Sequence, residues 1–195
     1  MEINFSAISN IFLDFLRYPA KDFSFDDKLS QLIFLIIKTN KILWDLEDSS
    51  RLPELGDRHV AEAKKKIDIC NQKRNDLIRE IDVEVSKYLN VSPGLPEEFY
   101  SESFGVIIDK LSIMFIKQSI IRSLLTVIKE EDLRSEYEKK EKIIIRQIKN
   151  TGRFIDLYIK RLIDKKVFFE IQEPVKIYND NRIKNYLKLI DEGKT

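Results

Sequence analysis

Residues 105–129, GVIIDKLSIMFIKQSIIRSLLTVIK, decide the fold, because apolar side chains occupy nearly every side of a helix built from them. A helix with 3.6 residues per turn that is apolar all round must be surrounded by other elements. We therefore predict that this segment is the central helix of a bundle. Its Asp109 shares a face with Ile113, Ile116 and Ile120, so one carboxylate is predicted to lie inside.

Breaks in the sequence define the neighbouring helices. Proline and glycine mark boundaries at Tyr18-Pro19, at residues 53–56 and at residues 92–96 (SPGLP). Between these breaks the apolar periodicity predicts helices at residues 6–17, 26–49, 57–89 and 131–166, followed by an extended segment at residues 167–178. The predicted fold class is all-α: an antiparallel helical bundle of about five main helices with a short C-terminal extended segment.

We expect a single helical domain over residues 1–195, because no repeat, low-complexity tract or linker divides the chain. Residues 1–25 would form an N-terminal helix and loop, residues 26–166 the bundle, and residues 167–195 a C-terminal segment. A chain of this length buries about 70% of its unfolded surface.

Composition excludes several classes of protein. The 34 basic and 33 acidic residues give a net charge of +1, so the chain is not a strongly basic nucleic-acid binder. The longest apolar run, Leu32 to Ile37, is far shorter than the roughly 20 residues that span a bilayer. The N-terminus lacks the basic and apolar regions of a signal peptide, so we expect a cytoplasmic protein.

Catalytic motifs built on cysteine, histidine or glycine are also excluded. Cys70 and His59 are the only residues of their types, and helical geometry separates them by about 16 Å. They therefore form neither a Cys-His pair nor a zinc site. The sequence has no phosphate-binding glycine loop after a strand and no nucleophile elbow.

Polar residues fall inside the apolar arc of the second predicted helix. Placing successive residues about 100° apart puts Asn40 and Glu47 on the side shared by Leu43 and Trp44. Arg51 would continue the same stripe if the helix reached that far.

The predicted helix at residues 57–89 has a similar pattern. Arg74 lies near the centre of its apolar arc, while Asp68, Asn71, Asn75 and Asp82 stack along one flank. Burying such groups without partners costs several kcal/mol each. Polar groups converging from three helices therefore indicate a site.

The alternative to a site is a buried ion pair that fixes the register of the helices. Either Glu47 with Arg74, or Asp109 with an arginine, would form such a pair. The basic stripe of the fifth predicted helix could bind phosphate or an acidic partner. Because it lies opposite the apolar stripe of that helix, we expect it to be a solvated outer face.

The inward polar residues lie within segments that match known motifs. Residues 40–51 (NKILWDLEDSSR) resemble N-x-x-L-W-x-x-E-D-x-x-R, and residues 65–82 (KKIDICNQKRNDLIREID) resemble a second motif of the same family. Residues 101–113 (SESFGVIIDKLSI) are similar to S-E-T-x-G-S-x-I-D-R-L-S-I, and residues 176–180 (KIYND) to K-M-Y-N-D-P. Together they resemble the bacterial family catalogued as domain of unknown function number 4254.

This resemblance implies a helical fold and an association with cell-surface polysaccharide gene clusters, but no assigned activity. The chain also departs from the family pattern. Asp45 and Ile37-Lys38 stand where the family often has histidine, Ser103 replaces threonine, Lys110 replaces arginine, and Arg79 replaces an acidic residue.

The first functional hypothesis is a polar pocket that binds a phosphorylated or nucleotide-activated sugar in polysaccharide biosynthesis. Glu47 and Asp109 would be its catalytic groups if the protein is an enzyme, which stays open. The ligand-binding residues would be Asn40, Arg51, Asn71, Arg74, Asn75 and Ser112, with the arginines on phosphate. Glu47, Asp68 and Asp109 would hold Mg²⁺, which prefers oxygen ligands.

The second hypothesis is a non-catalytic helical partner of a glycosyltransferase or polysaccharide assembly complex, with a homo-oligomer as a further expectation. Contact would use exposed aromatic residues such as Tyr100, Phe168 and Phe169. An exposed apolar patch at residues 167–171 would favour this hypothesis, whereas an enclosed polar cavity would favour the pocket.

Overall fold

The computed structural model describes residues 3–52, 56–91 and 98–171, together with residues 173, 182, 183, 186, 188 and 190. These residues form five helices and two short strands: α1 (Phe5–Arg17), α2 (Lys28–Ser50), α3 (Gly56–Tyr88), β1 (Glu98–Tyr100), α4 (Phe104–Leu125), α5 (Glu131–Ile163) and β2 (Val167–Phe169). The predicted all-α fold, with its short extended segment after the last long helix, is confirmed. The KIYND segment at residues 176–180 lies outside the described residues.

Side-chain caps set the starts of three helices. The carboxamide of Asn4 accepts from the amide of Ala7, and the carboxylate of Asp27 accepts from the amide of Ser30. Ser103 caps α4 by accepting from the amide of Val106. Each cap satisfies an amide that has no partner within its own helix, so the helices begin close to the predicted positions.

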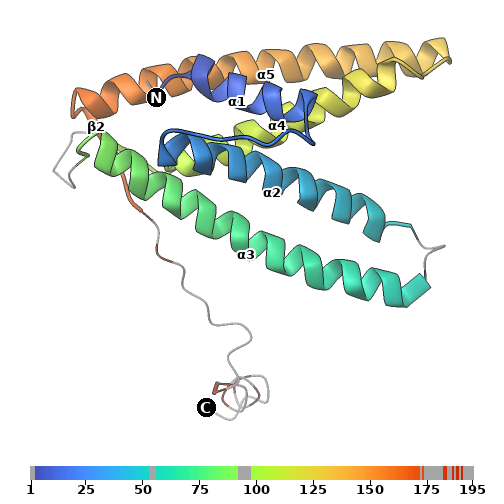
Figure 1. The fold of residues 1–195 in the computed structure, drawn as a ribbon, viewed down its shortest axis with the longest axis horizontal. Helices are drawn as coiled ribbons and strands as arrows, with labels where there is room; N and C mark the ends of the chain where they lie inside the picture. Colours follow the sequence, from blue (N-terminus) through green and yellow to red (C-terminus); the bar gives the residue numbers. More distant parts are fainter. Residues whose placement is uncertain are drawn as a thin grey trace.

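The long helices form two hairpins that meet at one end and diverge at the other (Figure 1). In one hairpin α2 packs along α3, and in the other α4 packs along α5. Helix α1 lies against α2, α4 and α5 at the closed end. There β1 pairs in parallel with β2, with Glu98 opposite Val167 and Tyr100 opposite Phe169, which ties the segment before α4 to the segment after α5.

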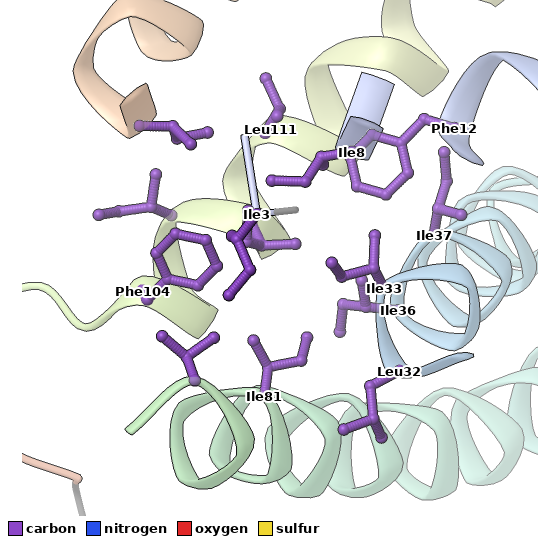
Figure 2. Close-up of a cluster of buried hydrophobic side chains, with 14 of the residues drawn as sticks. Ile3, Ile8, Phe12, Leu32, Ile33, Ile36, Ile37, Ile81, Phe104 and Leu111 are labelled. Atoms are coloured by element: carbon purple, nitrogen blue, oxygen red, sulfur yellow. The ribbon is translucent and has the colours of Figure 1, made fainter. Parts of the chain in front are cut away.

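The core lies where the two hairpins and α1 meet. Figure 2 shows Phe12 of α1, Ile33 of α2, Ile81 of α3 and Leu111 of α4 pointing toward one another, and each of them is fully buried. By contrast, no residue from 119 to 143 is buried. The start of α4 is therefore central, as predicted, while its end projects away from the core with the start of α5.

Two glycines mark close approaches between helices. A Cβ at Gly105 would overlap the backbone carbonyl oxygen of Ile78, so only glycine lets α4 cross α3 at this separation. A Cβ at Gly152 would lie 2.6 Å from the ring of Phe5. Helix α5 runs through Gly152 without interruption, so this residue makes room for α1. No helix in the described part of the chain is long and apolar enough to cross a membrane.

Candidate functional site

A buried carboxylate connects three helices at the closed end. Asp109 of α4 is 2% exposed and accepts from Arg74 of α3 through both carboxylate oxygens. The distances are 2.8 Å from Nε to Oδ1 and 2.6 Å from Nη2 to Oδ2. Asn40 of α2 donates through Nδ2 to the same Oδ1 at 2.8 Å. One side chain from each of α2, α3 and α4 therefore meets at this point.

Ser112 completes this group, which we call the polar network (Asn40, Arg74, Asp109 and Ser112). Its hydroxyl accepts from Asn40 Nδ2 at 2.7 Å and donates to the backbone carbonyl of Asp109 at 2.8 Å. Among the described residues, no buried side-chain nitrogen or oxygen lacks a hydrogen-bond partner. The polar network is thus internally satisfied, which is the condition for a polar group to be tolerated in a core.

The pair stabilises the charged form of Arg74. The hydrogen bond to Asp109 raises the pKa of Arg74 above its ordinary value, against the opposing effect of burial. The Arg74 side chain is 32% exposed, whereas that of Asp109 is 3% exposed. The Asp109–arginine pair named as the alternative to a ligand site is therefore present, and it ties α3 to α4.

Several residues predicted to face the interior do not. Glu47, Arg51, Asp68 and Asn75 are exposed, and Asn71 is half-buried. The prediction of an inward position is wrong for Glu47, Asp68 and Asn75, and for Arg51 it required a longer helix, whereas α2 ends at Ser50.

The divergence of the hairpins explains the exposure on α2. Glu47 follows Asn40 by seven residues, about two helical turns, so both lie on the same side of α2. At the level of Asn40 this side contacts α4. Two turns later α4 has moved away from α2 (Figure 1), and Glu47 faces solvent.

The predicted Mg²⁺ ligands are not brought together. Among the described residues, no group of three or more His, Cys, Asp or Glu side chains is arranged to hold a metal ion. Asp109 is enclosed in the polar network, while Glu47 and Asp68 lie on exposed surfaces of α2 and α3. The proposed metal set of Glu47, Asp68 and Asp109 is therefore incorrect as a first coordination shell in this structure.

An open cleft of about 420 Å³ lies between α2 and the α4–α5 hairpin. It is lined by Trp44, Lys117, Ile120, Ile121, Leu124, Tyr137, Lys140, Ile143, Ile144 and Gln147. On both α2 and α4 the cleft begins about one turn beyond the polar network, since Trp44 follows Asn40 and Lys117 follows Ser112. Its lining is mainly apolar and contains two lysines but no carboxylate.

The polar groups of the cleft come from α4 and α5. Lys117 is exposed and forms no salt bridge with a described residue. Lys140 lies 4.4 Å from the centroid of the Tyr137 ring and pairs with Glu136 at 2.6 Å. The helical pattern of the sequence did not predict these residues. Lys117 did carry a signal, because it is a cation within a helix that is apolar almost all round.

A second buried carboxylate, Asp82, lies at the crossing of α3 and α4. It is 2% exposed, and its Oδ1 accepts from the amide of Gly105 at 2.6 Å. Burial raises the pKa of Asp82 to about 6, although hydrogen bonds from Ser103 and Gly105 oppose the rise. The sequence placed Asp82 on the polar flank of its helix but did not predict its burial.

The aromatic contact surface of the second hypothesis is not exposed. Phe169 is 5% exposed within the core, and Tyr100 and Phe168 are half-buried. Tyr100 packs on Tyr158 with ring centroids 4.9 Å apart, and its hydroxyl accepts from Arg161 at 3.0 Å. The prediction of exposed aromatics here is wrong because β1 and β2 pair with each other and β2 packs against α5, which encloses these side chains.

These features define an all-α protein in which two helical hairpins are joined by a buried polar network. Residues 30–169 match the family model described as "Protein of unknown function (DUF4254)", and the chain belongs to this family. The matched span includes the whole polar network and the whole lining of the cleft. Neither a curated protein nor a solved structure matches the chain.

Proposed function

We propose that the cleft between α2 and the α4–α5 hairpin binds a phosphorylated or nucleotide-activated sugar used in cell-surface polysaccharide biosynthesis. The observation that carries this proposal is the lining itself: two ammonium groups and two aromatic rings around about 420 Å³, with no carboxylate. Ligand sites in proteins are typically of this size, mainly apolar, with a few polar groups that fix the ligand.

In this proposal each part of the ligand has a counterpart in the lining. Lys117 attracts phosphate groups as a mobile point charge, and Lys140 contributes a second ammonium group by exchanging its exposed partner Glu136 for phosphate. Trp44 and Tyr137 present flat apolar faces for a base or for the apolar face of a sugar ring. The absence of acidic lining residues favours an anion over a cation, because like charges near the phosphate would oppose binding.

The polar network has a positioning role in this proposal. Asn40 and Ser112 bind each other one turn before Trp44 and Lys117, so they fix the two walls of the cleft relative to each other. Glu47 and Arg51 continue the stripe of Asn40 and Trp44 along α2 and are exposed. In this proposal Glu47 accepts hydrogen bonds from hydroxyl groups, and Arg51 donates to phosphate groups, of a ligand that extends beyond the cleft.

A thermal-shift series tests the proposal. The probes are uridine diphosphate glucose, glucose 1-phosphate, inorganic phosphate and uncharged methyl glucoside. A ligand at 100 times its Kd stabilises the folded state by about 2.7 kcal/mol. We expect the two sugar phosphates to raise Tm and methyl glucoside to leave it unchanged.

The variant K117Q/K140Q should abolish the shift, since it removes both ammonium groups of the cleft. A matched control is K64Q/K73Q, which makes the same charge change at exposed positions of α3. The proposal fails if neither sugar phosphate changes Tm, or if the control loses the shift as fully as the cleft variant does.

A further inference from the structure

Helix α5 carries a row of cations on the side that faces away from the protein. The basic row comprises Lys142, Arg146, Lys149, Arg153 and Lys160, all of them exposed. At about 100° per residue these side chains fall within roughly 60° of one another, and they extend over about 27 Å of the helix. The buried residues of α5, such as Ile144, Ile155 and Leu162, lie on the other side.

The cations of the basic row have no acidic partners within the described residues. No salt bridge joins any of them to a carboxylate, although most exposed basic–acidic neighbours elsewhere on α5 do pair, as Arg134 does with Glu138. The nearest acidic residue along the row is Asp156, whose Oδ1 accepts the amide of Phe5 at 2.8 Å. The row therefore has a net positive charge, with the exposed carboxylate of Asp156 at its edge.

Charge is concentrated on this part of the chain. Residues 142–163 contain six basic residues and one acidic residue, a net charge of +5, whereas the whole chain carries +1. The remaining residues therefore carry a net charge of −4. An almost neutral protein with one strongly positive edge orients that edge toward a polyanion.

Exposed aliphatic side chains flank the basic row. Ile145 and Ile163 lie on one side and are 41% and 57% exposed, and Leu157 lies on the other side and is 51% exposed. A nucleic acid would neutralise the cations but leave these apolar groups in water. The interface of a bilayer takes up both, because phosphates bind the cations and the acyl boundary receives the apolar side chains.

We propose that the outer face of α5 docks the protein onto a membrane surface rich in anionic phospholipids. Figure 1 shows α5 along one long edge of the molecule, with α1 and α4 on its other side, so the row can lie flat against a planar surface. The cleft residues of α5, including Tyr137 and Lys140, lie on a different side of the helix. Docking is thus compatible with an open cleft, and it does not depend on the proposed ligand.

Vesicle co-sedimentation of the full chain tests this proposal. We compare vesicles of phosphatidylcholine with vesicles that also contain phosphatidylglycerol. Each cation near an anionic surface contributes about fivefold to binding, equivalent to ~1 kcal/mol. The variant K142Q/R146Q/K149Q/R153Q should therefore bind anionic vesicles several hundredfold more weakly, on the order of fivefold per charge.

The matched control is K64Q/K65Q/K66Q/K73Q, which removes four exposed cations from α3. It should retain most of the binding, because these cations lie away from the proposed contact. Equal loss in the two variants would overturn the proposal, as would equal binding of the native chain to neutral and anionic vesicles.

Substitution of the flanking aliphatic residues distinguishes binding to a lipid surface from binding to another polyanion. The variant I145S/L157S keeps every charge but should weaken vesicle binding, most visibly at high salt, where screening reduces the contribution of the cations. The second test is competition between anionic vesicles and duplex DNA for the full chain. If DNA binds more tightly than anionic vesicles and I145S/L157S binds vesicles normally, the surface is a nucleic-acid contact and the proposal is wrong.

Discussion

At the scale of single residues, Asp82 combines burial with a backbone partner across a helix crossing. Its pKa of about 6 exceeds its ordinary value of 3.8 because burial disfavours the carboxylate. Between these two values the folded protein holds the proton more tightly than the unfolded chain does. Asp82 therefore contributes stability that is fully present below about pH 3.8 and is lost as the pH rises through about 6.

We predict that Asp82→Asn removes this pH dependence. Relative to the variant, the native chain should lose up to about 3 kcal/mol of unfolding free energy between acidic and neutral pH. Urea unfolding across that range measures the difference. Glu80→Gln, at an exposed position of the same helix, should follow the native curve. A constant difference between Asp82→Asn and the native chain would show that Asp82 titrates normally.

The Arg74–Asp109 pair gives a second prediction at this scale. Removing one partner of a buried pair leaves the other uncompensated and costs about 3–5 kcal/mol. Because the Arg74 side chain is 32% exposed, solvent reduces the cost and we expect the lower end of that range. Arg74→Met should cost more than Asp109→Leu, since it leaves the more buried charge alone.

A double-mutant cycle tests this coupling. Arg74→Met combined with Asp109→Leu should cost less than the sum of the single changes by roughly 1–3 kcal/mol. Additive effects, measured by chemical denaturation, would mean that the two side chains contribute independently and that the polar network does not act as a unit.

Placing residues at about 100° per step around each helix predicted which side faces inward, but it did not predict how far along the helix that side is buried. Asn40, Arg74, Asp109 and Ser112 were all identified, because each lies on an apolar arc and finds a partner across a helix contact. Glu47 lies on the same stripe yet is exposed. Phase gives a direction around one helix, whereas exposure depends on whether a neighbouring helix is still present at that height.

At the scale of elements, two glycines allow close helix contacts for different reasons. Gly105 faces the backbone carbonyl of Ile78, which cannot move without disturbing α3. Gly152 faces the ring of Phe5, a half-buried side chain that can rotate. Their replacement by alanine should therefore have unequal effects, even though both glycines are buried.

We predict that Gly105→Ala costs about 3 kcal/mol, the upper end for overpacking a well-packed contact. Gly152→Ala should cost ~1 kcal/mol or less, since alanine also gains up to about 1 kcal/mol of helix propensity over glycine. Thermal unfolding of the two variants shows which substitution costs more stability. A larger loss for Gly152→Ala would indicate that the contact between α1 and α5 is the more rigid one.

The elements themselves were predictable because their signals are local. Caps and breaks follow from residues within one turn of the helix end, such as Asp27 before α2 and Pro19 after α1. The divergence of the two hairpins has no such local signal. It depends on how α1 fills the closed end, which is a property of the assembled molecule.

At the scale of the whole molecule, the two hairpins share one core at the closed end and separate from it. The fully buried residues Ile33, Ile81, Ile108 and Ile155 come from four different helices. No residue from 119 to 143 is buried, so in that stretch α4 and α5 pack mainly against each other, and only its first turn, with Ile120 and Ile121, also packs on the core. Helices with few tertiary contacts have marginal stability in water.

Hydrogen exchange should therefore be graded along the α4–α5 hairpin. Amides around Ile108 and Ile155 should exchange only through global unfolding, while amides of residues 119–143 should exchange through local opening at a lower free energy. Mass spectrometry of peptides from both regions measures the contrast. If the amides of both regions were equally protected from exchange, another molecule would have to pack on residues 119–143 of the hairpin. If that protection increased with protein concentration, that molecule would be a second copy of the chain, because only self-association depends on concentration in this way.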